Sequence, residues 1–227
     1  MHFFILILLL CFIIFLFCLY VVSHDDFVLL RRDISTDSLF NISFLMAPLS
    51  LISARLLYVA THPSRNFLNP LYFLLFPYFP GLSLLGGVLG AGLFLFLIFR
   101  ARKMPALRLL DLFSLSAASF MPIGGIGYFL LSGSNIFSFG VLFTVFSYIF
   151  LFLFFAFFLL PRFLKGRVRE GNMATLFLTA YSFISLLGKV ADGKFSLGLE
   201  SIVLILVLIS SAAFFIRKEK LILKLRK

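Results

Sequence analysis

Long apolar runs separated by short polar breaks dominate this chain. A run of about 20 apolar residues is long enough to cross the ~30 Å hydrocarbon layer of a membrane as a helix. Because an unpaired backbone amide in lipid costs several kcal/mol, each run is expected to be helical, and unbroken runs such as 146–160 exclude a transmembrane barrel. The pattern predicts an all-α, integral membrane seven-helix bundle. Its spans are expected at about residues 3–23, 39–60, 71–99, 108–131, 137–160, 174–190 and 197–216.

Composition excludes a water-soluble domain. The chain is 62% apolar and 13% charged, which leaves too little polar surface to cover a soluble core. No linker, repeat or long polar insertion divides it, so residues 1–227 are expected to form a single multi-pass membrane domain. The net charge of +11 would suit nucleic acid, but the Lys and Arg clusters adjoin apolar spans, where anionic lipid headgroups attract them. Nucleic-acid binding is therefore not expected.

The basic residues predict the orientation of the bundle. Sixteen of the 20 Lys and Arg residues lie on one side of the predicted membrane, in the segments that follow the first, third, fifth and seventh spans. Three lie on the opposite side (Arg65, Lys189 and Lys194), and Arg55 lies inside the second span. Because cytoplasmic loops are enriched in Lys and Arg, the N-terminus is predicted outside and the C-terminus in the cytoplasm. The first run is too long for a signal peptide and no cleavage site follows it, so an uncleaved span is expected.

Neither a metal site nor a cofactor is expected. Cys11 and Cys18 lie on one predicted helix, separated by about 10.5 Å of axial rise, which is beyond the reach of a disulfide. The three His residues and two Cys residues show no metal-ligand spacing.

One structural ion pair is predicted at the cytoplasmic end of the fourth span. Arg108 and Asp111 are about one helical turn apart, a spacing at which opposite charges can pair.

Arg55 is the first candidate for chemistry inside a span. An Arg in the hydrocarbon layer costs a few kcal/mol even on lenient insertion scales, so its side chain should face the bundle interior with a partner. Because Arg55 lies near the outer end of its span, its charge could instead extend to the outer interface. Glu200, in the first turn of the seventh span, is a candidate partner and a second candidate catalytic residue, although the helix dipole alone explains a carboxylate there. The nearby Lys189, Asp192 and Lys194 are expected to form a solvated outer loop.

The third span begins with an interrupted segment. Pro77 and Pro80 prevent a continuous helix, so residues 71–79 are expected to form a half-helix or re-entrant piece, with the true span beginning near Gly81. Small residues that allow close helix packing follow, and these are Gly86, Gly87 and Gly90.

The fourth span is expected to be interrupted near its outer end. Pro122 is followed by three glycines within residues 124–127, which should loosen the helix and free backbone amides. Such backbone is tolerated at membrane depth only where it is buried in protein or lines a cavity. Arg55 and Glu200 fall in the same outer third of the membrane. This arrangement favours an outward-facing, lipid-accessible cavity over simple helix packing.

The order of these features resembles that of the bacterial prolipoprotein diacylglyceryl transferases, a family of seven-span enzymes with an external N-terminus. The resemblance runs from about residue 27 to about residue 214. The stretch Ala54-Arg55-Leu56 is similar to a Gly-Ala-Arg stretch of the family. Further similar segments are the Gly-rich 81–90, Leu110-Asp111-Leu112, Gly124 to Phe129, and Gly198 to Ser201.

The resemblance implies a lipid-transfer reaction. These enzymes move a diacylglyceryl group from phosphatidylglycerol to the cysteine thiol of a lipoprotein precursor, forming a thioether and releasing glycerol phosphate. A bacterial inner-membrane transferase is implied, with a phosphatidylglycerol-like phospholipid and a lipoprotein precursor as partners. Arg55 would hold the phosphate, with Glu200, His62 or Arg65 recruited beside it. The implied substrate-binding residues are Tyr58, Gly86, Gly87, Gly90, Gly124 and Gly127.

Several polar positions of the family hold other residues here. Gly125 stands where the phosphate-holding Arg belongs, and Tyr128 replaces Asn. Leu85 and Ser185 stand at the positions of the third-span His and the sixth-span Arg, and the acid that closes the family motif falls at Gly133. The chain is predicted to be a divergent transferase; the alternative is a catalytically inactive relative that binds phospholipid or a membrane partner. The two interrupted spans suggest a small transporter or lipid translocator as a third possibility.

Overall fold

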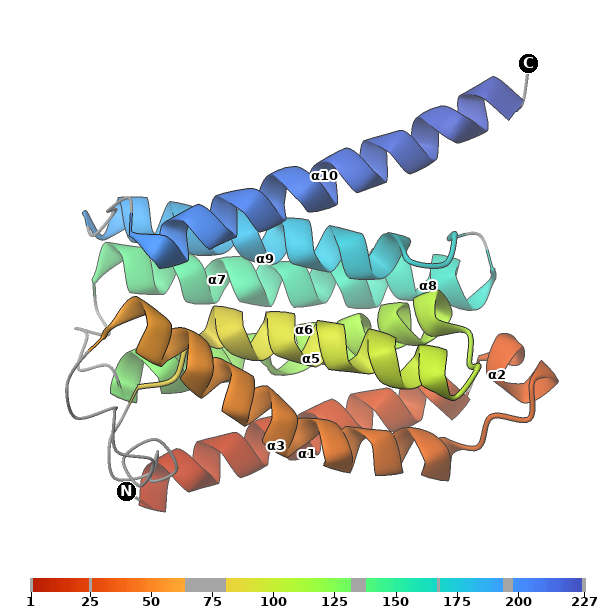
Figure 1. The fold of residues 1–227 in the computed structure, drawn as a ribbon, viewed down its shortest axis with the longest axis horizontal. Helices are drawn as coiled ribbons and strands as arrows, with labels where there is room; N and C mark the ends of the chain where they lie inside the picture. Colours follow the sequence, from red (N-terminus) through yellow and green to blue (C-terminus); the bar gives the residue numbers. More distant parts are fainter. Residues whose placement is uncertain are drawn as a thin grey trace.

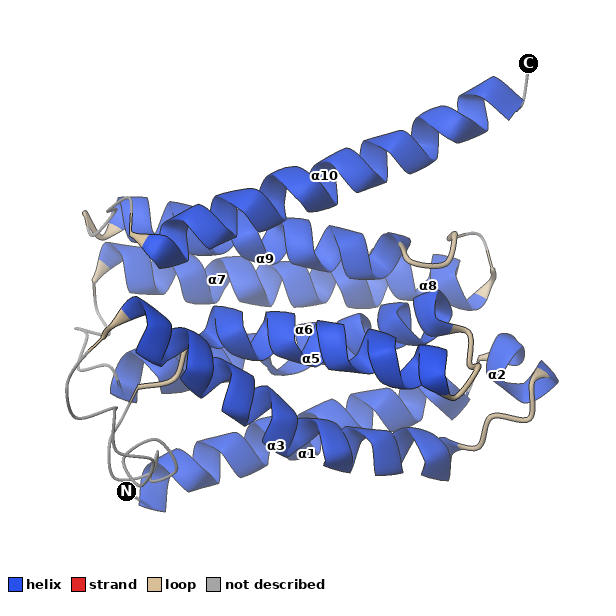
Figure 2. Cartoon of the chain, in the orientation of Figure 1, coloured by secondary structure: helices blue, strands red, loops and turns tan. Residues whose placement is uncertain are grey.

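The computed structural model describes residues 2–24, 26–63, 81–131, 138–166, 168–193 and 198–225. The described residues are helical and contain no strand, and seven helices are long and apolar enough to cross a membrane (Figure 2). These are α1 (His2–His24), α3 (Thr36–Thr61), α5 (Leu84–Ala101), α6 (Ala106–Leu131), α7 (Phe139–Phe154) with its continuation, α9 (Asn172–Ala191) and α10 (Leu199–Leu225). The prediction of an all-α, multi-pass membrane protein is confirmed.

Two additions depart from a simple series of spans. The short helix α2 (Phe27–Arg31) follows α1, and α7 continues through the π-helix η2 (Phe155–Leu159) into α8 (Leu160–Leu164). The fifth span therefore runs from Phe139 to Leu164.

The bundle is built around α6. This helix packs against α1, α5, α7 and α9, while α3 pairs with α5 and α10 packs on α9 (Figure 1). In the apolar window of α6, 56% of the residues are buried, compared with at most 33% in any other span. The start of α1 and the end of α10 lie at opposite ends of the bundle, as an odd number of spans requires (Figure 1). The side of the membrane that each end faces stays a prediction.

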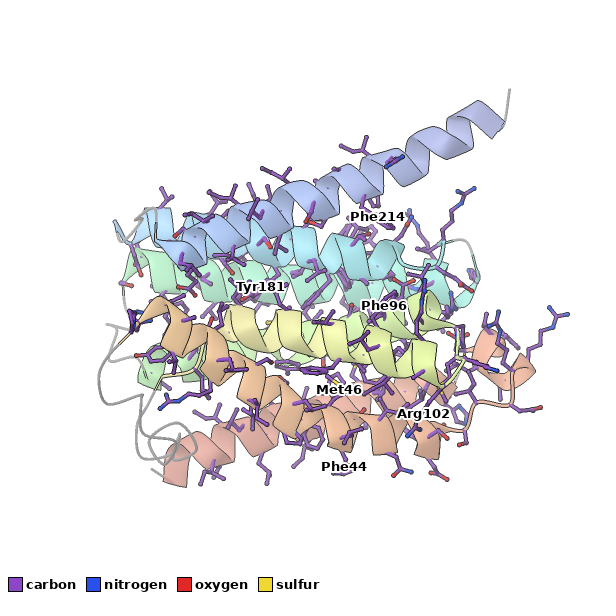
Figure 3. All side chains as sticks on the ribbon, in the orientation of Figure 1. Phe44, Met46, Phe96, Arg102, Tyr181 and Phe214 are labelled. Carbon is purple, nitrogen blue, oxygen red and sulfur yellow. The ribbon has the colours of Figure 1, made fainter. Side chains whose placement is uncertain are left out.

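The outer helices present apolar side chains on both faces. Met46 and Tyr181 are buried, Phe44 and Phe214 are about half exposed, and Phe44 projects away from the bundle (Figure 3). Exposed large apolar side chains occur on each of the seven long helices. A helix that is apolar all round is expected where lipid, rather than water, surrounds the protein.

The interruption expected in the fourth span is wrong, because α6 continues through Pro122 to Leu131. Proline removes one intrahelical hydrogen bond, but neighbouring helices pack closely around the site. A Cβ on Gly127 would overlap the side chain of Ile7 on α1, and one on Gly125 would lie 3.3 Å from Tyr148 on α7. The glycines therefore permit close packing. The transporter hypothesis relied on two interrupted spans, and the fourth span is a continuous helix.

The third span starts close to the expected position. Ser83 caps α5 by accepting a hydrogen bond from the Gly86 amide at 3.3 Å, and the helix begins at Leu84. Gly81 has a φ of +152°, a conformation that side chains other than glycine rarely adopt. Residues 71–79, the predicted half-helix, lie outside the described residues.

The ion pair predicted between Arg108 and Asp111 is also corrected. Arg108 pairs with Asp26, with an Nη2–Oδ2 distance of 2.9 Å, and both side chains are buried. Asp111 instead accepts hydrogen bonds from the amides of Gly171 and Ala174 at the start of α9. Arg108 and Asp111 therefore contact segments far from them in the sequence instead of each other.

Candidate functional site

A cavity of about 210 Å³ lies where α5 and α10 begin and α6 and α9 end. These helix ends come together at the side of the bundle that the charge pattern predicts to be outer. The described lining residues are mainly aromatic and polar. They are Leu84, Gly125, Tyr128, Phe129, Thr144, Tyr148, Tyr181, Ser185, Gly188, Lys189, Asp192, Glu200 and Leu204.

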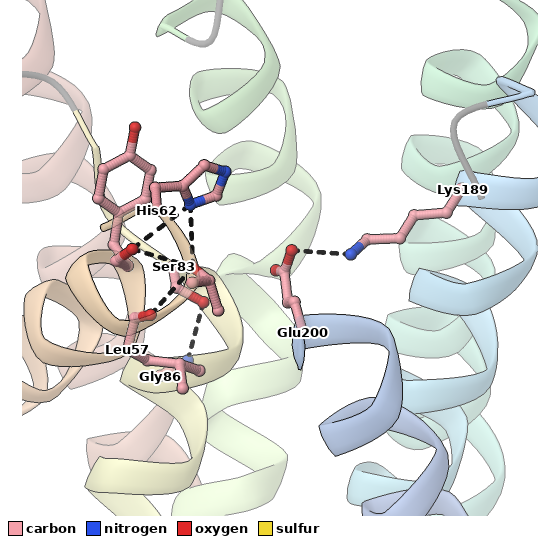
Figure 4. A network of polar contacts seen from close by, with 8 residues as sticks. Leu57, His62, Ser83, Gly86, Lys189 and Glu200 are labelled. Atoms are coloured by element: carbon pink, nitrogen blue, oxygen red, sulfur yellow. Dashed lines mark hydrogen bonds and ion pairs between the residues drawn. The ribbon is translucent and has the colours of Figure 1, made fainter. Parts of the chain in front are cut away.

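An ion pair between α9 and α10 lines this cavity. Lys189, in the last turn of α9, contacts Glu200, in the first turn of α10, with an Nζ–Oε2 distance of 2.8 Å (Figure 4). Each side chain is 28% exposed, so the pair is partly accessible. The prediction that Lys189 belongs to a solvated loop is wrong, and the carboxylate considered as a partner for Arg55 pairs with Lys189. Glu200 is thus placed in a cavity together with a cation.

A third charged side chain is fixed by the contact between α7 and α9. Asp192 caps the end of α9 and accepts a hydrogen bond from the Ser138 hydroxyl at 3.0 Å. A Cβ on Gly140 would overlap the Asp192 carboxylate, and one on Gly188 would overlap the Thr144 hydroxyl. The two small residues let the helices approach closely, which holds the carboxylate at the cavity.

Tyrosines supply hydroxyls and aromatic faces to the cavity. The Tyr148 hydroxyl lies 3.1 Å from the Ser185 hydroxyl, and the Tyr148 and Tyr181 rings are stacked with centroids 6.3 Å apart. Both rings are buried, whereas Tyr128 is 39% exposed. The inner wall is therefore aromatic and rigidly packed, and the accessible wall carries Tyr128, Lys189 and Glu200.

Arg55 is buried, with 1% of its surface exposed. Its Nη1 donates to the Gly81 carbonyl at 2.7 Å, and its guanidinium lies 5.8 Å from the centroid of the Tyr58 ring. The Ser83 amide donates to the Ala54 carbonyl at 3.1 Å, so α3 holds the segment that leads into α5 at two points. The alternative in which Arg55 extends to the interface is wrong. Arg55 fixes the segment before α5 instead of lining the cavity.

Tyr58 and His62 form a stacked pair at the end of α3, with ring centroids 4.6 Å apart. His62 is exposed, and its Nδ1 lies 2.9 Å from the Thr61 hydroxyl (Figure 4). Arg65, the other residue considered as a recruit, lies outside the described residues.

The predicted substrate-binding glycines lie in two helix contacts. Gly86, Gly87 and Gly90 pack against α3, and Gly124 and Gly127 pack against Cys11 and Ile7 of α1. At these positions the absence of a side chain allows the helices to pack closely. The role of these glycines in binding a substrate stays a prediction. The sequence predicted close helix packing for the third-span glycines, whereas it predicted a loosened helix for those of the fourth span, which also lie in a helix contact.

The cavity brings together three positions at which the chain departs from the resembling family. Gly125, Tyr128 and Ser185 come from α6 and α9 and line the same space. Leu85 is buried next to the lining residue Leu84. Lys189 and Asp192 lie beside them and were missed as site residues, because charges at a helix end are usually solvated. Their only sequence signal was their proximity to Glu200 across a short turn.

A known protein family matches most of this chain. A family model described as prolipoprotein diacylglyceryl transferase matches residues 1–189. No curated protein and no solved structure matches the chain. The matched region covers six of the seven spans and ends at Lys189, so Glu200 follows it. This chain, a seven-span membrane protein with a polar cavity at one end of its bundle, belongs to the prolipoprotein diacylglyceryl transferase family.

Proposed function

We propose that this protein is a transferase of the bacterial inner membrane that moves the diacylglyceryl group of a glycerophospholipid to the cysteine of a lipoprotein precursor. Family membership supports the reaction class. The observation that carries the assignment to this cavity is the partly exposed Lys189–Glu200 pair on its wall. Such a pair contributes about 1 kcal/mol or less to stability, so a bound substrate can replace it without unfolding the site.

The proposed reaction is a substitution at carbon. The cysteine sulfur forms a bond to the glycerol carbon that carries the phosphate, and the bond between this carbon and the phosphate oxygen breaks. The headgroup phosphate leaves with the electron pair, as glycerol phosphate if the donor is phosphatidylglycerol. Lys189 holds the phosphate as its charge develops. Glu200 accepts the thiol proton, which activates the sulfur as a nucleophile.

Arg55 has a positioning role in this proposal. By bonding to the Gly81 carbonyl it fixes the start of α5, whose Leu84 lines the cavity. This role differs from the direct contact with phosphate that the family resemblance implied. The glycines of α5 and α6 contribute indirectly, because they set how closely α3 and α1 approach.

Lys189→Gln tests the proposal. The purified full-length protein in phospholipid vesicles is given a synthetic peptide with the lipoprotein-type cysteine, and the thioether product is measured by mass spectrometry. Removing a fixed group that stabilises developing charge lowers the rate by about two to three orders of magnitude, and we expect this for Lys189→Gln. Lys165→Gln is the matched control, because Lys165 is exposed at the end of α8 and lies outside the cavity lining. Equal rates for the two variants would rule out the assigned role of Lys189.

A non-catalytic relative that binds phospholipid is the second candidate. It is favoured by the neutral Gly125 and Ser185 in the cavity, at positions where the family resemblance places cations. In that case the vesicle assay yields no thioether product from wild type, although the protein is correctly inserted and retains lipid. Product formed by wild type excludes this candidate.

A further inference from the structure

The short helix α2 lies at the end of the bundle opposite the one where α10 begins (Figure 1). Two of its apolar side chains are exposed, Phe27 by 76% and Leu30 by 64%. Their spacing of three residues places them on the same face of the helix, whereas Leu29 is buried in the core. One side of α2 therefore faces the protein, and an apolar side faces away from it.

Asp26 fixes the position of α2. Its Oδ1 accepts a hydrogen bond from the Val28 amide at 2.8 Å, and its Oδ2 accepts one from the Arg108 Nε at 3.0 Å. The Nη2 of Arg108 also donates to the Phe163 carbonyl of α8 at 3.3 Å. The buried Arg108 thus holds α2 beside the start of α6 and beside α8. The exposed apolar side of α2 has a defined place at this end of the bundle.

Exposed basic side chains occur in pairs on the segments that meet at Arg108. They are Arg31 and Arg32 at the end of α2, Arg102 and Lys103 between α5 and α6, and Arg162 and Lys165 at α8. Over the whole sequence, including the segments that the structure does not describe, this end of the spans carries 16 Lys and Arg residues and seven Asp and Glu residues. The seven include Asp33 and Asp37, which follow α2. The end of the bundle that holds α2 is therefore strongly positive.

We propose that Phe27, Leu30, Arg31 and Arg32 form a lipid contact surface that binds anionic phospholipid headgroups at this end of the bundle. The two apolar side chains enter the boundary between headgroups and acyl chains, and the two arginines contact the phosphates. An apolar face beside exposed cations is typical of helices that lie in the membrane interface. Basic residues next to a span attract anionic lipid headgroups. This surface lies at the end opposite the cavity, so the inference does not depend on the proposed function.

A single fluorophore tests the inference, because the chain contains no tryptophan. The full-length Phe27→Trp protein is placed in phosphatidylcholine vesicles that contain one part in ten of phosphatidylserine, which differs from the donor that the resemblance implies. Bromine near the headgroup end of the acyl chains, on either the phosphatidylserine or an equal amount of the phosphatidylcholine, quenches the fluorescence on contact. We expect phosphatidylserine to be enriched roughly fivefold beside the fluorophore, the factor that one basic residue near an anionic surface supplies.

Two further variants separate this surface from general contact with lipid. Phe139→Trp is the matched control, because Phe139 is 74% exposed at the start of α7, at the opposite end of the bundle. We expect no enrichment of phosphatidylserine there. Arg31→Gln together with Arg32→Gln, in the protein that carries Phe27→Trp, should reduce the enrichment toward even. All of these substitutions are at exposed positions and leave the Asp26–Arg108 pair in place.

Three outcomes overturn the inference. Absence of quenching by either brominated lipid would show that water or a soluble partner covers the exposed side of α2. Equal quenching by the two lipids would show contact with lipid but no selection of anionic headgroups. Enrichment that the two arginine substitutions leave unchanged, or that Phe139→Trp reports equally, would exclude the assigned role of Arg31 and Arg32.

Discussion

Arg55 and Arg108 lie within apolar helices, are buried, and each donates to a defined acceptor. Arg108 pairs with Asp26, and its guanidinium also lies 3.5 Å from the centroid of the Phe163 ring. Arg55 donates to the Gly81 carbonyl. A buried charge costs several kcal/mol unless paired, so each arginine fixes the segment that supplies its acceptor. Arg108 thereby joins the segment after α1 to α6 and α8.

Asp26→Asn tests the contribution of a single buried pair. Removing one partner of a buried ion pair typically destabilises a protein by about 3–5 kcal/mol, because the remaining charge is left uncompensated. We expect a clear drop in the thermal unfolding midpoint of the protein in detergent. Asp33→Asn, an exposed change after α2 with the same loss of charge, should leave the midpoint nearly unchanged. Equal midpoints for the two variants would show that the Asp26–Arg108 pair contributes little.

Among the helices, the contact between α3 and α5 shows how small residues set the distance between elements. A Cβ on Gly86 would lie 2.7 Å from both the Leu57 Cβ and the Ser53 carbonyl oxygen. Backbone at this distance cannot move aside as a flexible side chain can. The same contact holds Leu84 at the cavity, so helix packing positions the site.

Gly86→Ala and Gly92→Ala form a matched pair on α5. Overpacking a close contact usually costs about 1–3 kcal/mol, and we expect Gly86→Ala to lower the unfolding midpoint accordingly. Nothing lies within 4 Å of a Cβ built on Gly92, so Gly92→Ala should be tolerated. Thermal unfolding in detergent compares the two variants. A larger loss from Gly92→Ala would contradict the assigned packing.

For the whole molecule, the orientation in the membrane decides which compartment the cavity faces. The seven spans place the start of α1 and the end of α10 at opposite ends of the bundle (Figure 1). The cavity lies at the end where α10 begins. The distribution of Lys and Arg predicts that the cavity end is outside. Secreted lipoprotein precursors would meet the cavity on that side.

Reporter fusions test this orientation. Green fluorescent protein joined to the C-terminus should fluoresce, because the basic end of the chain is predicted to stay in the cytoplasm, where this reporter folds. Alkaline phosphatase, which is active only outside the cytoplasm, should be inactive at the same position. Both reporters are compared at matched expression levels in bacterial cells. The reverse pattern would place the cavity on the cytoplasmic side and contradict the proposed encounter with secreted precursors.

The sequence alone determined the spans, because membrane insertion depends on the length and apolarity of a local segment. The expected span 3–23 agrees with α1 to one residue at each end, and 174–190 agrees with α9 within two. The order of the Gly-rich segments also predicted the family that the comparison confirmed. Arg55 stood out for a local reason too, because any charge inside an apolar run needs a partner.

Only the tertiary structure decided which side chains meet. Glu200 pairs with Lys189 instead of Arg55, and Arg108 pairs with Asp26 instead of Asp111. These choices depend on how each helix is rotated about its axis and where it crosses its neighbours, which no single run of sequence encodes. For the same reason the predicted glycines were found in helix contacts. The charged residues of the cavity are close together in the sequence, but the walls that enclose them come from α5, α6 and α7, which are distant in the sequence.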